Sequence, residues 1–432
     1  MLSKLDDKTI MRKKTTMILC GLMATALPAA AQEATPTRLE ALEKRTEVLE
    51  AEAARQKKLK ISGYLQAQWQ WGLQAASLKV GAANENPDET FNRFGIRRGR
   101  IKFTYEEKIA SGVFQLDITE KGVKFKDAYL NIKDPWAGSM ALRAGIFDRP
   151  FGNEISYSSS RRESPERSTV FQTLFPDERD LGAMLVLQAP KASPWSVLKL
   201  EAGLFAGNGI QSDTDNKKDF IGHLSLAKTF GNSISFGLGT SYYNGRVYQG
   251  TSHVYTVRDK MFAPDNAEAN QGGFAKREYI GFDAQFSVSG RLGLTQLRGE
   301  YLFGQQPGTD KSTKSPNSPA LPATDTYIRD FSGWYLILVQ DLGKSPFSLV
   351  AKYDFYDPNT KVSENEIDTE NGFTKADLSQ STFGFGALWH INSALRLQAF
   401  YEINRNETSA RIAGMDKELK NDVFTLRMQY KF

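Results

Sequence analysis

The sequence predicts an all-β protein, a transmembrane antiparallel β-barrel of about sixteen strands that follows a short N-terminal helical segment. Three observations predict this fold: segments in which apolar and polar residues alternate, short turns that alternate with longer polar loops, and a final alternating segment that ends on Phe432. A period of two puts one set of side chains on each face of a strand, as a strand between lipid and water requires.

The N-terminal residues 1–31 are expected to be an export signal. A basic start at residues 12–14, beginning from either Met1 or Met11, precedes a short apolar core and three alanines. The apolar run is too short to span a membrane. Because Cys20 is the single cysteine and lies in this segment, the mature chain is expected to have no disulfide and no thiolate chemistry.

Residues 32–58 are rich in Glu, Ala, Lys and Arg, which favour a helix. Two sets of residues recur at seven-residue spacing: Leu39, Thr46 and Ala53, and Leu42, Leu49 and Gln56. The segment is either a weak trimerising coiled coil or a solvated helical spacer.

The net charge of the whole chain is only +5, which argues against a nucleic-acid binder. The mean hydropathy of −0.44 and the lack of any apolar run of ~20 residues after the signal exclude a helical membrane protein.

The barrel is predicted to occupy residues 59–432. Short turns are expected at residues 108–111, 134–139, 190–196, 230–233, 289–291, 342–346 and 392–394. Longer loops are expected at about 73–92, 120–123, 148–181, 207–217, 244–275, 305–327, 358–379 and 405–420. Seven turns and eight loops connect sixteen strands, an even number, with the short turns on the periplasmic side.

Five short runs together resemble the phosphate-selective porins O and P, over roughly residues 59–432. The runs are Phe94-Gly95-Ile96-Arg97-Arg98-Gly99-Arg100-Ile101, Lys126-Asp127-Ala128-Tyr129-Leu130, Gly145-Ile146-Phe147-Asp148-Arg149-Pro150-Phe151-Gly152-Asn153-Glu154, Arg179-Asp180-Leu181-Gly182 and Tyr353-Asp354-Phe355-Tyr356-Asp357-Pro358-Asn359. The resemblance implies a sixteen-stranded, trimeric outer-membrane porin whose third loop folds into the lumen. It also implies diffusion of anions such as phosphate or polyphosphate past inward-facing arginines and lysines.

The loop at residues 148–181 is the longest of the eight, and loops of this length are usually functional. Its candidate constriction residues are Arg149, Glu154, Arg161, Arg162, Arg167 and Arg179. Arginine suits oxyanion transfer because its planar fork pairs with phosphate oxygens. Five basic residues stand against seven acidic ones. Opposed acids and bases would create a transverse field typical of a general porin; alternatively, these charges pair with each other and with the wall to pin the loop.

Basic residues also recur on one face of the second predicted strand. Arg98, Arg100 and Lys102 are two residues apart, about 7 Å, and face the lumen if Phe103 faces lipid. Such a ladder can pass an anion between weak sites. Arg97 falls on the other face and is expected at the rim. Further lumen candidates on later strands are Arg143, Lys352, Arg427 and Lys431. The alternative is that these charges only keep the lumen wet.

No catalytic centre, metal site or cofactor is expected. The three histidines, His223, His253 and His390, are scattered and lie in no nucleophile motif. Asp354 and the run at residues 357–359 could offer oxygen ligands to a cation, but Asp-Pro-Asn is more typical of a turn. The other interpretations left open are a structural or adhesive outer-membrane barrel, an outer-membrane enzyme and a soluble β-sandwich lectin.

The sequence therefore predicts a passive, water-filled channel for small solutes in the bacterial outer membrane, with a preference for small anions, or alternatively a general porin. Expected partners are small anionic solutes, outer-membrane lipids, two further copies of the chain in a homotrimer, and the barrel assembly machinery through the strand ending in Phe432. Active transport is not expected, because the residues between signal and barrel are too few for a plug.

Overall fold

The computed structural model describes residues 45–46, 50, 58–231 and 233–432. The predicted export signal lies outside the described residues, and so does the predicted helical segment apart from Arg45, Thr46, Glu50 and Lys58. Leu59–Phe432 form one compact unit. In the part of the chain that is described, no helix is both long and apolar enough to cross a membrane.

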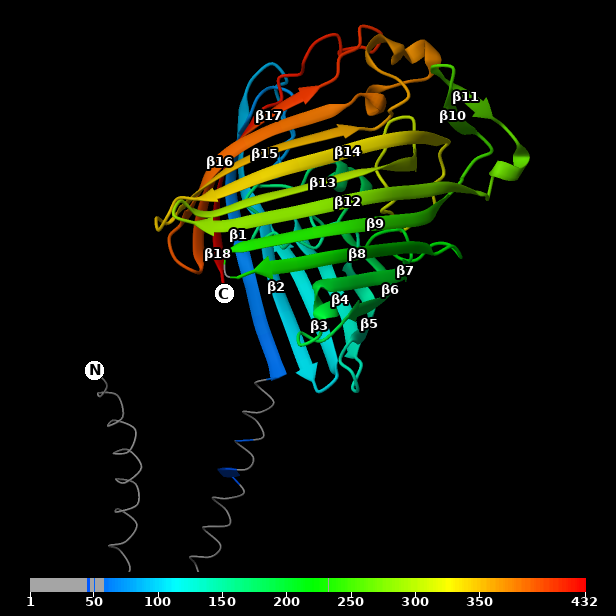
Figure 1. Cartoon of the computed structure of the whole chain (residues 1–432). Coiled ribbons are helices and arrows are strands. Elements are labelled where there is room, and N and C mark those ends of the chain that lie inside the picture. Colours follow the sequence, from blue (N-terminus) through cyan, green and yellow to red (C-terminus); the bar gives the residue numbers. More distant parts are fainter. Residues whose placement is uncertain (1–44, 47–49, 51–57, 232) are drawn as a thin grey trace, which may run out of the picture. The chain divides into compact units, whose positions relative to one another are not determined.

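Sixteen antiparallel strands form a closed barrel, as the alternation predicted (Figure 1). Closure is direct, because β1 pairs with β2 on one side and with β18 on the other. The first nine strands are β1 (Leu59–Gly72), β2 (Phe91–Glu107), β3 (Ala110–Thr119), β4 (Gly122–Lys133), β5 (Met140–Asp148), β6 (Arg179–Gln188), β7 (Leu198–Phe205), β8 (Asp219–Phe230) and β9 (Ile234–Tyr248). The other seven are β12 (Phe274–Gly290), β13 (Gly293–Gly308), β14 (Thr326–Asp341), β15 (Phe347–Asp357), β16 (Gln380–His390), β17 (Leu395–Asn406) and β18 (Val423–Lys431).

All seven predicted short turns join consecutive strands at one end of the barrel, and the longer connections join them at the other. The shortest of the latter is the tight turn at residues 120–121. The helical turns are α3 (Thr169–Leu174), η1 (Pro194–Val197), η2 (Glu268–Asn270), η3 (Glu364–Glu366), η4 (Thr369–Asn371) and η5 (Lys375–Asp377). The end with short turns is called the inner side below, and the end with long loops the outer side.

Side chains alternate across the wall as expected. On β1, Ile61 and Leu65 are exposed, whereas Gln66 and Gln68 are buried inside. Along β18 and the following Phe432, the exposed apolar row Leu426, Met428, Tyr430 and Phe432 alternates with the buried Thr425, Arg427 and Gln429. An apolar outer surface and a polar inner one are what a membrane-spanning barrel requires.

One expectation about side-chain direction was wrong. Arg97 was placed on the outer face at the rim, but β2 has a bulge here: Gln66 pairs with Arg98, and the next residue, Ala67, pairs with Ile96. The bulge leaves Arg97 as an extra residue opposite β1 and re-aims its side chain. Arg97 and Arg98 therefore both reach Glu166 inside the barrel.

The long loops on the outer side carry structure of their own. The predicted loop at 244–275 contains a hairpin of β10 (Val254–Arg258) and β11 (Met261–Asp265), and β10 also pairs in parallel with the start of β14. A second apolar cluster joins this hairpin to the two loops that follow β15 and β17: Val257, Phe262, Val362, Ile367, Phe373, Leu378, Ile412 and Met415. These loops are thus held in fixed positions around the outer mouth (Figure 1).

Candidate functional site

The connection between β5 and β6, residues 149–178, is called the third loop and folds against the inside of the wall. Phe151, Phe171 and Phe175 of this loop are fully buried. The ring of Phe175 lies 5.7 Å from that of Tyr279 and 6.0 Å from that of Tyr243, centroid to centroid. Such contacts add stability beyond the burial of apolar area. One part of the lumen is therefore a packed apolar core, where the sequence indicated only a water-filled space.

Two glycines let the loop approach the wall closely. Gly152 has a φ of +61°, and a Cβ there would lie 1.9 Å from Oε2 of Glu300. Only glycine accepts both the backbone conformation and the contact without strain. On β12, a Cβ at Gly281 would lie 2.7 Å from the ring of Phe151.

Glu166 is the electrostatic anchor of the third loop. Arg97 Nε donates to its Oε1 at 2.7 Å and Arg98 Nη2 to its Oε2 at 2.8 Å, while Arg427 Nη2 donates to Oε1 at 3.1 Å. Burial raises the pKa of Glu166, but the three guanidinium groups outweigh this and hold that pKa well below its ordinary value. Three positive charges meet one negative charge, so the cluster keeps a positive excess.

The other acids at residues 148–180 also have basic partners. The pairs are Asp148 with Arg179, Glu154 with Lys352, Glu163 with Arg298, Asp177 with Lys126, Glu178 with Arg167 and Arg179, and Asp180 with Arg149. Four of the seven acids, Glu166 included, thus pair with basic residues of the barrel wall and not with residues of the same segment. This arrangement matches the pinned-loop interpretation.

The predicted constriction residues take different positions. Arg149 is buried under the loop, 5.4 Å from the ring centroid of Phe175, and Arg179 begins β6 and donates to Asp127 Oδ1 at 2.9 Å. Arg167 ties the loop together, because its Nε donates to Glu154 O at 2.8 Å and its Nη1 to Glu178.

Arg161 and Arg162 differ from these residues, because neither forms an ion pair with any residue that the structure describes. Arg161 is exposed, whereas Arg162 is buried and its guanidinium has no hydrogen-bond partner among those residues. Burial lowers the pKa of Arg162, and the neighbouring Arg167 and Arg98 lower it further. Arg161 therefore adds an exposed positive charge to the third loop that no acid of the described residues pairs with.

The basic residues on the wall also divide into those that have a partner and those that have no ion partner. Arg98 is committed to Glu166 and to Gln66, and Arg100 Nε donates to Asp117 Oδ2 at 3.4 Å. Arg143 lies over the ring of Tyr129, 4.9 Å from its centroid. Lys102, in contrast, has no ion partner in the described part of the chain, so its charge faces the lumen uncompensated.

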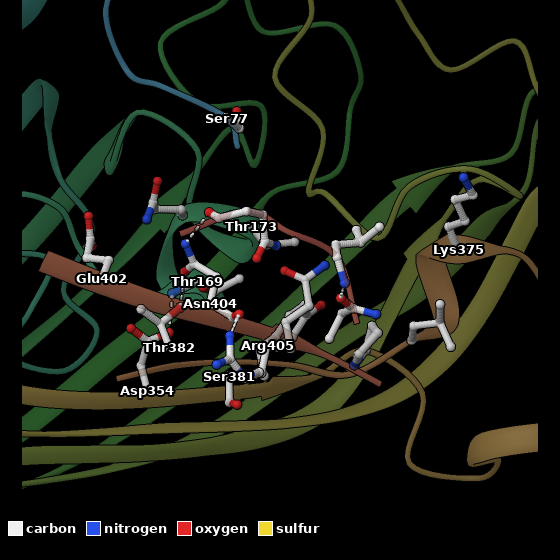
Figure 2. Close-up of a pocket in the computed structure, with 18 of the residues that line it drawn as sticks. Ser77, Thr169, Thr173, Asp354, Lys375, Ser381, Thr382, Glu402, Asn404 and Arg405 are labelled. Atoms are coloured by element: carbon white, nitrogen blue, oxygen red, sulfur yellow. Dashed lines mark hydrogen bonds between the residues drawn. The ribbon is translucent and has the colours of Figure 1, made fainter. Parts of the chain in front are cut away.

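Two of the cavities that the third loop lines lie on its outer and inner sides. The outer cavity, about 710 Å³, is bounded by the loops after β1, β13 and β15 and is lined by six basic and three acidic side chains (Figure 2). The inner cavity, about 260 Å³, is lined by five basic side chains, Arg100, Lys102, Arg167, Arg179 and Lys431, against two acidic ones. Arg167 lines both cavities, so it marks the boundary between the two sides of the lumen.

A family model for phosphate-selective porin O and P matches residues 38–270. The chain belongs to this family. The porin fold is also found in solved structures: OmpF of Salmonella typhi in complex with daunomycin (12% identity, 87% of this chain and 97% of that chain, TM-score 0.53) and the outer-membrane channel DcaP of Acinetobacter baumannii (11% identity, 87% and 97%, TM-score 0.51). None of the curated proteins compared with the chain matches it significantly. Family and fold place this porin in the bacterial outer membrane.

Family and fold point to a channel rather than an enzyme. The arrangement closest to a hydrolytic triad in the described barrel is Ser348, His390 and Asp341. Ser348 Oγ lies 3.1 Å from His390 Nε2, but the same hydroxyl donates to Asp341 Oδ1 at 2.6 Å. The carboxylate therefore holds the serine and not the imidazole, which is the wrong order for activating a nucleophile.

The run at residues 357–359 forms a turn, because Asn359 N donates to Asp357 Oδ1 at 2.9 Å. Among the residues that the structure describes, no group of three or more His, Cys, Asp or Glu side chains is arranged to hold a metal ion.

The anchors of the third loop are expected to survive mild acid. The pKa values of Glu154, Glu166 and Glu178 all lie below their ordinary value, because basic neighbours outweigh the effect of burial. A lowered pKa gives stability that is complete above the unfolded-state pKa, about 4.3, and is lost as the pH falls through the folded-state value. Most of any rise in open-channel current noise on acidification should therefore come below about pH 4. A rise that is complete between pH 7 and 5 would contradict this assignment.

Proposed function

We propose that this porin is a passive channel that prefers small anions, of which phosphate is the reference solute. The observation that carries the proposal is the charge balance around the third loop: its acids are paired, three arginines share Glu166, and basic side chains outnumber acidic ones in both cavities. A permeating anion therefore meets a positive lumen on either side of the narrow region.

The inner cavity supplies the chemistry for an oxyanion. Lys102 and Lys431 have no ion partner among the described residues, and the hydroxyl groups of Ser156, Ser158 and Ser160 line the same cavity. Ammonium and hydroxyl groups can replace part of the hydration shell of a phosphate. Because these contacts are few and partly exposed to water, the anion can leave as well as enter.

Two further assignments belong to this proposal. We infer a homotrimer, as the family resemblance implies, and docking of the barrel assembly machinery on the exposed apolar row of β18 that ends at Phe432. Native mass spectrometry of the detergent-extracted protein should give three times the mass of the mature chain.

Residues 1–31 are proposed as the export signal, and residues 32–58 as a periplasmic helical segment.

Single-channel recording with phosphate titrated into chloride tests the function. Phosphate should reduce the chloride current at low millimolar concentration, and Lys102→Gln should weaken this block several-fold. Lys191→Gln, which removes a charge from a short turn at the inner rim, should leave the block unchanged. Channels without phosphate block and without ion preference would indicate a general porin. No channels from folded barrels would indicate a structural role.

A further inference from the structure

The outer cavity is larger than a bare inorganic anion needs. Its volume of about 710 Å³ lies within the range of about 300–1,000 Å³ typical of pockets that enclose an organic ligand. The loops around it are held by the outer apolar cluster. A rigid cavity of this size can select a solute by shape and hydrogen bonding, and not by charge alone.

One part of the outer cavity is basic. Lys314 and Lys375 line it without an ion partner in the described residues, and Lys311 has only the exposed Asp310, at 4.0 Å. Thr374 Oγ1 donates to Asp310 O at 2.5 Å, which holds the loop of Lys311 beside the loop of Lys375. These ammonium groups can receive an anionic group.

Another part of the cavity is acidic. Figure 2 shows Glu402 and Asp354 on one side and Lys375 on the opposite side of the residues drawn. The carboxylate of Glu402 makes no hydrogen bond or ion pair with the described residues. Asp354 accepts from Thr169 N at 3.2 Å, and its Oδ2 lies 3.7 Å from Lys352 Nζ. A carboxylate is an acceptor only. This side of the cavity therefore offers acceptors to hydroxyl or ammonium donors.

Neutral hydrogen-bonding groups lie between the two charged parts. Ser381, Thr382 and Thr169 are found between Glu402 and Lys375 (Figure 2). Thr382 Oγ1 donates to Asn404 Oδ1 at 2.8 Å, which fixes the position of that hydroxyl. Hydroxyl and amide groups can each donate and accept, so they match a solute that carries several hydroxyl groups.

We propose that the outer cavity is a binding site for a polyhydroxylated anion, such as a sugar phosphate or a sugar acid. The anionic group contacts the lysines around Lys375, and the hydroxyl groups donate to Glu402 and Asp354. This inference rests on the proposed anion preference and deepens it, because it adds a site that inorganic phosphate fills only in part.

The test compares four probes as blockers of chloride current through single channels: glucose 6-phosphate, inorganic phosphate, glucose and 2-aminoethyl phosphate. Glucose 6-phosphate should block at a concentration at least tenfold lower than inorganic phosphate, and glucose should block poorly because it lacks the anionic group. Tighter block by 2-aminoethyl phosphate than by glucose 6-phosphate would overturn the proposal, since it would show that the acidic side receives an ammonium group.

Two substitutions locate the site. Glu402→Gln should raise the half-blocking concentration of glucose 6-phosphate about fivefold. The half-blocking concentration of inorganic phosphate should stay unchanged or fall. Lys375→Gln should raise both values. The matched controls Glu268→Gln, in η2 after the outer hairpin, and Lys191→Gln, in a short turn, should change neither value.

The failure of this inference is distinguishable from the failure of the proposed function. An anion-preferring channel that glucose 6-phosphate blocks no better than inorganic phosphate would overturn the sugar-anion site alone. A channel without anion preference in a salt gradient would overturn both.

Discussion

Replacing Glu166 with glutamine is expected to release the third loop from the wall. The amide keeps the shape of the side chain but removes the negative charge that Arg97, Arg98 and Arg427 share. Removing one partner of a buried ion pair typically costs about 3–5 kcal/mol, because the remaining charges stay buried without compensation. The unfolding midpoint in urea should fall, and single channels should show larger and noisier currents.

The control for this result is Glu370→Gln, which removes an exposed acid on an outer loop and should change neither the midpoint nor the noise. Glu166→Asp keeps the charge on a shorter side chain and should give an intermediate effect. If Glu166→Gln has the stability and the quiet current of the unaltered protein, the three arginines do not anchor the loop.

Reversing two charges in the inner cavity is expected to invert the ion preference. Lys102→Glu with Lys431→Glu changes the lining from five basic and two acidic side chains to three and four. One unit charge at ~4 Å contributes about 1 kcal/mol even in bulk water. The anion-to-cation permeability ratio should therefore fall at least tenfold, measured as the reversal potential under a salt gradient.

Lys108→Glu with Lys191→Glu alters two lysines of exposed short turns and controls for total charge. Because Lys431 lies next to the chain end that the assembly machinery is proposed to read, Lys102→Glu alone should also be recorded, with a smaller shift of the same sign. An unchanged reversal potential in properly folded double-variant barrels would exclude these lysines from the ion pathway.

The wall of the barrel was predictable because its signal is local. Lipid on one side and water on the other impose an alternation that can be read within ten residues, as in β1 and β18, and the turn residues fix where each strand ends. The closure of β1 on β18 follows from an even number of strands. The strand count, the turn positions and the exposed faces were confirmed for these reasons.

The interior was less predictable because its contacts join distant segments. Glu166 meets Arg427 across 261 positions and Arg98 across 68, and the sequence gives no indication of which acid meets which base. The bulge that turns Arg97 inward also could not be predicted from the alternation of apolar and polar residues.

One interior signal was available. Thr169–Phe175 is an apolar and aromatic run in a loop, and Phe205, Ile221 and Tyr243 are apolar residues on lumen-facing positions. Apolar residues on both faces of neighbouring strands indicate that something packs inside. These residues could have predicted which strands of the wall the third loop packs against, but not the ion pairs of the loop.

The central claim is that paired acids leave the lumen positive. The most direct test is the reversal potential of the unaltered protein in a planar bilayer, with a tenfold gradient of potassium chloride. The predicted result is a reversal potential whose sign shows that chloride is more permeant than potassium. The sign should stay the same when potassium is replaced by a larger cation. A potential of the sign for potassium would contradict the account, because it would mean that the acids of the third loop, and not the basic residues around them, set the field that a permeating ion meets.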